Sequence, residues 1–258
     1  MIHGFTVPGA VEAAQRKKGF TKGLFEWLRK APWGNPVFSG VIIALFGFGF
    51  LGGISGVMMG TEQLNMIIHN TIYVPGHFHA TVVIGTTLTF MALTYYLIPV
   101  LFKREMINPG LAKWQPYLFG LSMYGFVLVM MGAGTLGVSR RHWDMAFQGA
   151  ALAYEWPGAA YLMMGLVGLT GVVAIAGGAI FVYITVGSLL WGRKLETGAE
   201  SPKFTPIPRA APTVAAQTYG SMGFAAPGTF ALAMVFLLAF VLYYFINWKY
   251  LSTLWGLS

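Results

Sequence analysis

The sequence predicts an all-α integral membrane protein, and three observations support this fold class. The chain has 258 residues, of which 56% are hydrophobic and only 9% are charged, whereas soluble domains carry roughly 25% charged residues. Its mean hydropathy is +0.65. Five apolar runs each reach the roughly 20 residues that a helix needs to cross a bilayer core. We therefore expect five membrane-spanning helices.

Residues 1–34 differ from the membrane domain that we expect over 35–258. The apolar stretch from Phe5 to Gly9 is too short to span a bilayer, and Pro8 and Gly9 interrupt it. From Arg16 to Lys30, basic side chains alternate with apolar ones. This pattern favours a cytoplasmic segment lying on an anionic leaflet, with a solvated basic tail as an equally supported alternative. The first residues lack the basic region followed by an apolar region that is typical of a cleavable signal peptide, so we expect none.

The expected spans cover residues 36–60, 76–102, 115–138, 157–191 and 224–247. The fourth is longer than a bilayer core requires, so we expect it to tilt or to project beyond the membrane. In the first span, Gly49 and Gly53, and Gly52, Gly56 and Gly60, have the small-xxx-small spacing that allows helices to pack closely. The Pro- and Ala-rich segment 196–216 is expected to be an exposed cytoplasmic loop.

The basic residues are distributed unevenly between the two sides of the expected membrane domain. Thirteen of the 16 fall before the first span, between the second and third, or between the fourth and fifth: Arg16, Lys17, Lys18, Lys22, Arg29, Lys30, Lys103, Arg104, Lys113, Arg193, Lys194, Lys203 and Arg209. The positive-inside rule makes those segments, and the N-terminus, cytoplasmic. This topology explains the net charge of +8 without a nucleic-acid partner.

A histidine-rich stretch, residues 69–79, leads into the second span. His77 and His79 lie two residues apart, which separates them by about 200° around an α-helix. Two imidazoles on opposite sides cannot easily chelate one small ion, but they can serve two different prosthetic groups. Haem suits this geometry better than zinc, because a haem iron can take an axial His from a helix beside the ring. The alternative is two imidazoles hydrogen-bonded to neighbouring helices.

Arg140 and Arg141 lie at the outer end of the third span, where the positive-inside rule disfavours them. They are interpreted as an anion clamp, since guanidinium groups bind carboxylates in fork geometry. Two haems would bring four propionate carboxylates to the same side as the histidines. Snorkelling or lipid-binding arginines are the alternative. His69 and Asn70 could bind the same carboxylates or water.

The sequence is sparse in other candidate ligands. Weaker candidates near the outer side are Glu62, Asn65, His142 and Asp144. The chain has no cysteine, which excludes thiolate metal sites. The second span carries five threonines (Thr81, Thr86, Thr87, Thr89 and Thr94). We expect these hydroxyls to bond to their own helix rather than to line a polar path.

These motifs resemble those of the catalytic subunit I of haem–copper oxygen reductases, the cytochrome c oxidase type. That family carries a His-(Asn/Asp)-Thr stretch followed by His-Phe-His, which matches residues 69–71 and 77–79 here, and an Arg-Arg pair, which matches Arg140-Arg141. Asn70 makes the stretch most similar to the B-type branch. The resemblance runs from about residue 36 through the fourth span.

The resemblance implies a role for each matching residue. His77 would be the proximal ligand of the high-spin haem that binds oxygen, and His79 an axial ligand of the low-spin haem. Phe78 would lie between the two haems. Arg140 and Arg141 would hold propionates, and His69 would belong to the propionate and water region.

The chain resembles only the C-terminal part of a bundle of twelve or thirteen helices. In this family, earlier helices carry the copper-binding histidines, the tyrosine linked to one of them and the second axial His of the low-spin haem. The resemblance therefore implies a split terminal oxidase, completed by a polypeptide with the N-terminal helices and the copper site. Subunit II with a copper centre, or another electron donor, and membrane lipid are the further expected partners.

The expected location is the prokaryotic inner membrane, with several passes and proton translocation linked to the respiratory chain. Two alternatives remain. One is a nitric oxide reductase related to the same family. The other is a non-catalytic membrane or transporter subunit, in which the histidines serve only packing.

Overall fold

The computed structural model describes residues 2–140, 156–195 and 226–254, and this part of the chain is helical with no β-strand. Five helices are long and apolar enough to cross a membrane: Pro36–Gly60, Tyr73–Leu101, Pro109–Thr135, Gly158–Trp191 and Pro227–Ile246. Each overlaps one of the five expected spans. The predicted all-α membrane fold is therefore confirmed, and the described residues form two compact units, residues 36–203 and residues 1–35 with 204–258.

The larger unit contains four of the spans. The first consists of α3 (Pro36–Phe46), the π-helix η1 (Gly47–Gly52) and α4 (Gly53–Gly60), and a short helix α5 (Glu62–Ile68) follows it. The second consists of α6 (Tyr73–Phe78), the π-helix η2 (His79–Thr87) and α7 (Leu88–Leu101). The third is α8 (Pro109–Thr135) and the fourth is α9 (Gly158–Trp191). The 34 residues of α9 extend about 51 Å, which exceeds the core of a bilayer.

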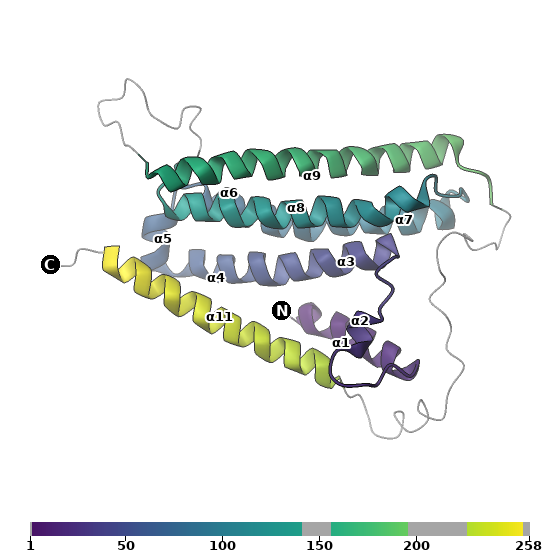
Figure 1. Ribbon diagram of the computed structural model, residues 1–258, viewed down its shortest axis with the longest axis horizontal. Helices are drawn as coiled ribbons and strands as arrows, with labels where there is room; N and C mark the ends of the chain where they lie inside the picture. Colours follow the sequence, from purple (N-terminus) through teal and green to yellow (C-terminus); the bar gives the residue numbers. More distant parts are fainter. Residues whose placement is uncertain (1, 141–155, 196–225, 255–258) are drawn as a thin grey trace. The chain divides into compact units, whose positions relative to one another are not determined.

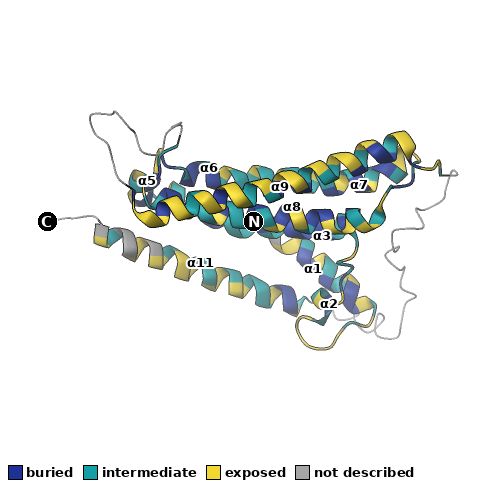
Figure 2. Cartoon of the chain, turned by 45° about the horizontal axis from the view of Figure 1, so that its top comes forward, coloured by how far each residue is buried: buried dark blue, intermediate teal, exposed yellow. Residues whose placement is uncertain are grey.

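Close glycine contacts hold the first two spans together. A Cβ on Gly47 would collide with Ile84, and one on Gly52 would lie 2.7 Å from Thr81 Cγ2. Gly49 and Gly60 face open space, so only part of the predicted small-xxx-small pattern is used for packing. Figure 1 shows α3 and α4, α7, α8 and α9 running alongside one another, and α8 contacts α3, α6 and α9. In Figure 2, α9 exposes much of its surface.

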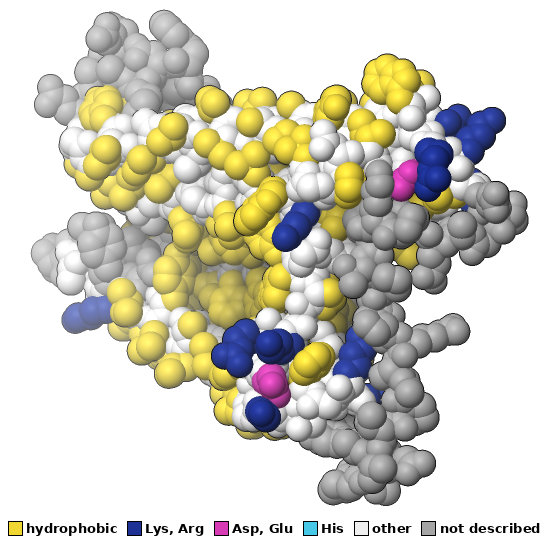
Figure 3. Space-filling view, turned by 45° about the vertical axis from the view of Figure 1, so that its right-hand side comes forward, with side chains coloured by type: hydrophobic (Ala, Val, Ile, Leu, Met, Phe, Trp, Pro, Cys, Tyr) yellow, Lys and Arg dark blue, Asp and Glu magenta, His cyan; other side chains and the backbone are white. Residues whose placement is uncertain are grey.

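The basic end of this unit is fixed by backbone pairing between two connecting segments. Glu105 N donates to Arg193 O at 2.8 Å, and Leu195 N donates to Lys103 O at 2.8 Å. Arg193 Nε also pairs with Glu105 Oε2 at 3.0 Å. These bonds join the end of α7 to the end of α9. In Figure 3, Lys and Arg side chains gather in patches while hydrophobic side chains cover much of the visible surface.

The smaller unit differs from the expectation for residues 1–34. Helix α1 (Ile2–Lys17) continues through Pro8, so the predicted interruption at Pro8 and Gly9 is wrong. Arg16 is not a solvated or lipid-facing cation either, because it is buried and pairs with buried Glu12 at 2.7 Å. Basic residues at 17 and beyond remain mostly at the surface, around the single-turn helix α2 (Glu26–Arg29).

Glu12 ties α1 to the start of α11 (Pro227–Leu254). Its carboxylate accepts hydrogen bonds from Gly228 N at 2.8 Å and from Thr229 N at 2.6 Å. A negative charge at a helix N-terminus is favourable, and here it satisfies two amides that lack partners within the helix. Burial tends to raise the pKa of Glu12, but the hydrogen bonds from Thr229, Arg16 and Gly228 outweigh it and lower the pKa below 4.5.

We predict that Glu12→Gln speeds hydrogen exchange at the Gly228 and Thr229 amides roughly tenfold or more, because a hydrogen bond to a charged group contributes about 1.5–3 kcal/mol. Since folding lowers the Glu12 pKa, its stabilisation is full above pH 4.5 and is lost as the pH falls through the folded value. Hydrogen-exchange mass spectrometry of the first turn of α11 measures both effects. Glu26→Gln is the matched control, because Glu26 accepts only an exposed bond from Lys22 N. Unchanged exchange in Glu12→Gln would contradict the capping role.

Candidate functional site

The site begins in the turn that precedes the second span. Asn70 has φ +62°, a left-handed conformation that asparagine tolerates better than most residues. Ile72 N donates to Val138 O at 2.9 Å, and Arg140 N donates to Asn70 O at 2.9 Å. These bonds join the turn to the segment after α8. Residues that are 70 positions apart in the sequence are thereby brought to one end of the bundle.

Helix α6 then packs against the last turns of α8. The two helices approach so closely at Gly134 and Gly76 that neither position has room for a side chain. An ideal Cβ on Gly134 would collide with Tyr73 N and lie 2.7 Å from Tyr73 Cα, and a Cβ on Gly76 would lie 2.7 Å from Met131 Cγ. Tyr73 itself is fully buried. The helix begins at Tyr73, three residues before Gly76, where the second span was expected to start. This contact fixes the position of α6.

His77 faces the first span. Its Nδ1 lies 2.9 Å from Ser55 Oγ, and a Cβ on Gly56 would lie only 3.0 Å from its Cε1. The Ser55 hydroxyl has one proton and donates it to backbone carbonyls of its own helix, Leu51 O or Gly52 O. Ser55 Oγ can then accept in the contact with His77, and this contact fits an imidazole proton on Nδ1.

His79 faces another neighbour. Its Nδ1 lies 2.7 Å from Pro75 O, and its ring centroid is 5.1 Å from that of Phe126 on α8. A carbonyl oxygen can only accept, so Nδ1 carries the proton here too. The two rings thus contact different helices, as their spacing predicts, and Phe78 between them is 54% exposed.

Both imidazoles are held through Nδ1, which leaves the lone pair of each Nε2 available for a metal. Neither of these two Nδ1 contacts involves the Nε2 atom of its ring. A histidine ligand usually donates its other ring N–H to an oxygen, which fixes the tautomer and the ring orientation. Ser55 and Pro75 provide these oxygens. No group of three His, Asp or Glu side chains is close enough to hold a metal ion among the described residues.

Arg140 lies at the same end of the bundle as the start of α6. Its Nη2 donates to Asn70 Oδ1 at 3.0 Å, while its Nε is buried and has no hydrogen-bond partner among the described residues. A buried N–H without an acceptor is costly, so this atom is suited to an anion. His69 is exposed at the neighbouring turn. Arg141, His142 and Asp144 lie outside the described residues.

The threonines of the second span bond to their own helix, as expected. Thr81 Oγ1 donates to His77 O at 3.3 Å, and Thr94 Oγ1 donates to Phe90 O at 2.8 Å. Thr86 and Thr87 reach carbonyls five residues earlier, a spacing that the π-helix η2 creates. They form no polar path within the described residues of this span.

The sequence alone does not indicate Ser55, Gly134 or Gly56 as parts of the site. Their contacts join different spans, and a serine or glycine in a membrane span most often serves packing alone. Only the small-xxx-small pattern could have indicated Gly56. It does not distinguish Gly56, which meets His77, from Gly60, which faces open space.

Comparison with known proteins identifies the family. The family model described as cytochrome c and quinol oxidase polypeptide I matches residues 4–168, a range that includes His77, His79 and Arg140. The chain belongs to this family. It is 34% identical over 206 residues to cytochrome c oxidase subunit 1 of Thermus thermophilus, and 30% identical over 155 residues to the corresponding subunit of Candida albicans.

The match covers only part of these family members. It includes 78% of this chain but 35% of the Thermus subunit, and 58% of this chain but 29% of the Candida subunit. A solved haem–copper terminal oxidase dimer has a TM-score of 0.62 and 26% identity to this chain, and the match covers 88% of this chain and 39% of that one. The chain therefore spans about a third of the length of these relatives.

The residues present fit the haems that the subunit I family binds. Two Nε2 atoms are available on opposite sides of one helix, and each ring is oriented through its Nδ1. Near the start of that helix, the buried Arg140 Nε has no acceptor among the described residues, and a propionate carboxylate could provide one.

We predict that Gly134→Ala lowers the stability of this subunit I chain by about 1–3 kcal/mol, because the new methyl group must displace the backbone of Tyr73 rather than a flexible side chain. Thermal unfolding of the purified protein in a fixed detergent measures the change. Gly165→Ala is the control, since Gly165 on α9 faces open space and alanine favours the helix by about 0.5–1 kcal/mol. Equal melting temperatures for the two variants would contradict the close contact between α6 and α8.

Proposed function

We propose that this chain is the C-terminal, haem-binding part of a terminal oxidase subunit I that reduces oxygen to water. The observation that supports this most directly is the pair His77 and His79, on opposite sides of one span, with each Nδ1 held by an oxygen. A ring whose Nδ1 is held by an oxygen has the arrangement typical of a histidine that binds a metal through Nε2. Membership of the cytochrome c and quinol oxidase family is the independent support.

Each residue has a proposed role in haem binding. His77 is the proximal ligand of the high-spin haem, and His79 is one axial ligand of the low-spin haem. The exposed ring of Phe78 fills the space between them. Arg140 and Arg141 hold propionates, with Asn70 positioning the Arg140 guanidinium at 3.0 Å. His69 belongs to the same carboxylate and water region.

The haems and copper supply the electron transfer and the oxygen chemistry, and the protein holds and orients them. Ser55 and the Pro75 carbonyl keep the Nδ1 protons in place, so that each Nε2 remains a lone-pair donor. Gly56 leaves room for the His77 ring beside the first span. The arginines offset the negative charge of propionates near the end of the membrane domain.

A separate polypeptide with the remaining helices of subunit I completes the site in our proposal. It supplies the copper ligands and the second axial ligand of the low-spin haem, and subunit II or another donor supplies electrons.

We place the assembly in a prokaryotic inner membrane, with the basic connecting segments and the N-terminus on the cytoplasmic side. The positive-inside distribution supports this orientation. Oxygen is preferred over nitric oxide as the substrate because the relatives are cytochrome c oxidase subunits. The matching solved structure is a terminal oxidase too.

We predict that His79→Ala removes the low-spin haem spectrum while His77→Ala removes the oxygen-reactive, high-spin one, because each ring serves a different haem. Absorption spectra of the assembled complex, with and without carbon monoxide, separate the two signals. Equal loss of both haems in each variant would argue against separate ligation. A wild-type complex with no haem Soret band would exclude both the oxidase and the nitric oxide reductase hypotheses.

We also predict that Gly56→Ala perturbs the high-spin haem selectively. The added methyl group would lie 3.0 Å from Cε1 of His77, so the ring must shift. Carbon monoxide binding should change at least severalfold while the low-spin band keeps its position, and rapid-mixing spectroscopy measures both. Gly60→Ala, a few residues along the same helix, meets nothing within 4 Å and serves as the control. Identical carbon monoxide binding by the two variants would contradict the proposed role of this contact.

A further inference from the structure

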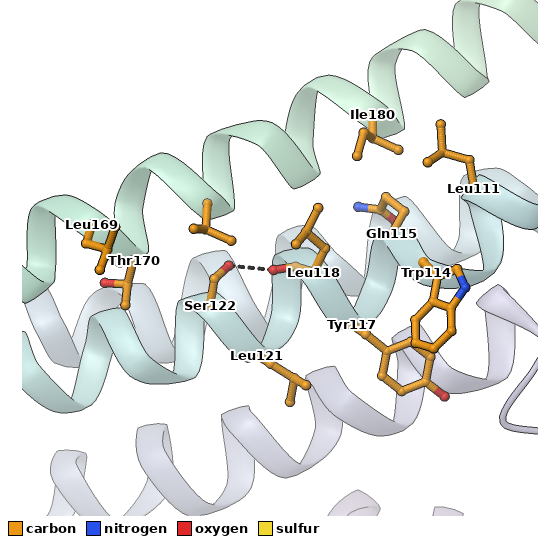
Figure 4. Close-up of a pocket in the computed structure, with 11 residues that line it drawn as sticks. Leu111, Trp114, Gln115, Tyr117, Leu118, Leu121, Ser122, Leu169, Thr170 and Ile180 are labelled. Atoms are coloured by element: carbon orange, nitrogen blue, oxygen red, sulfur yellow. Dashed lines mark hydrogen bonds between the residues drawn. The ribbon is translucent and has the colours of Figure 1, made fainter.

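A groove runs between α8 and α9 on the surface of the larger unit. Its volume is about 590 Å³, and side chains from both helices line it. The lining includes Leu111, Leu118 and Leu121 of α8 and Leu169, Val173 and Ile180 of α9. Leu121 points away from α9 in Figure 4. Figure 4 shows these side chains along the two helices, with Trp114 and Tyr117 near one end. Because α8 and α9 are both membrane spans, the groove lies at the depth of lipid acyl chains.

The polar side chains of the groove are already satisfied by the protein. Ser122 Oγ donates to Leu118 O at 2.6 Å, as drawn in Figure 4, and Thr170 Oγ1 donates to Leu166 O at 2.7 Å. Gln115 accepts from Tyr95 Oη at 3.1 Å and donates to Gly177 O at 3.2 Å. The groove thus offers apolar surface and little to attract a polar ligand, which suits a hydrocarbon chain.

The length of the groove matches one leaflet. Its lining extends from Leu111 to Ser122 on α8 and from Leu169 to Ile180 on α9. Eleven helical steps correspond to about 16 Å, and half of a bilayer's hydrocarbon core is about 15 Å. One acyl chain of a phospholipid would therefore fill the groove from the membrane interface to the midplane.

The end of the groove at Leu111 is equipped for a headgroup. Trp114 is 63% exposed there, and Lys113 Nζ lies 5.7 Å from the centre of its ring. Tryptophan is enriched at the membrane interface, and lysine there attracts anionic lipids. The exposed Lys103 and Lys194 belong to the paired connecting segments at the ends of α7 and α9. This end of the unit is therefore positively charged.

We propose that the groove between α8 and α9 is a binding site for one anionic phospholipid. An acyl chain lies between the two helices, and the phosphate lies at Lys113 beside Trp114. The charge at this end determines the occupant, since an uncharged lipid would use the apolar groove but gain nothing from the lysine. None of the residues that line the groove is a proposed haem ligand.

The test uses the assembled complex in nanodiscs of phosphatidylglycerol or of phosphatidylcholine with identical acyl chains, followed by native mass spectrometry of the lipids that remain bound. We expect wild type to keep one phosphatidylglycerol per chain, at least fivefold more often than phosphatidylcholine. Leu118→Trp fills the groove and should reduce retention to the phosphatidylcholine level. Lys113→Gln should abolish the preference between the two lipids.

Three further variants keep the outcome interpretable. Leu128→Trp adds the same bulk at an exposed position of α8 outside the groove, and Lys22→Gln removes a different positive charge, so both should behave like wild type. Val173→Trp fills the groove from α9 and replaces Leu118→Trp if that variant does not fold. Equal retention of both lipids by wild type, or undiminished retention in the filled variants, would overturn the proposal.

A photo-crosslinker distinguishes a lipid in the groove from a polypeptide that covers it. The chain has no cysteine, so Leu121→Cys carries a benzophenone at one position of this chain. Crosslinking to phosphatidylglycerol is the expected result. Crosslinking to another polypeptide would mean that a protein covers the groove, and the lipid site would be rejected.

Discussion

The close backbone approach of the second span to its neighbours on two sides is the constraint on which the site depends. Gly52 and Gly56 of the first span leave room for Thr81 and His77, and Gly134 of α8 leaves room for Tyr73. Each residue of an α-helix turns by about 100°, so a shift of one position would redirect both imidazoles. Tight contacts on two sides hold the helix in a single rotation, and this keeps His77 toward the first span and His79 toward α8.

The π-helix η2, which begins at His79, fits this constraint. The two π-helices, η1 and η2, pack against each other, and threonines of η2 bond to carbonyls five residues earlier. A π-helical turn adds a residue to the helix and changes the rotation of everything beyond it, which is why such turns are frequent at functional sites. Here His77 precedes η2, His79 is its first residue, and α7 follows it. Each half can therefore pack at its own best rotation.

Hydropathy and charge predict the five spans because membrane insertion depends mainly on local composition. The opposite directions of His77 and His79 also follow from local geometry. The sequence could not predict that Glu12 and Arg16 are buried, because Glu12 binds amides 216 and 217 residues away. It could not predict the Ser55 contact with His77 either, since this joins two spans. The error at Arg16 has the same origin, because Arg16 pairs with Glu12, which those distant amides hold in place.

Most polar side chains within the spans of the larger unit already have hydrogen-bond partners. A buried N–H group that could still bind an anion lies at one end of the unit. Hydroxyls within the spans mostly bond to carbonyls of their own helices, which removes them as ligands. Among the described residues of this unit, the buried side-chain polar atoms without a hydrogen bond are Arg140 Nε and Thr185 Oγ1. Arg140 Nε lies near the start of the helix that carries the two histidines. Since an unpaired buried N–H is costly in a membrane protein, its position there argues for an anionic group beside the haem ligands rather than for a packing role.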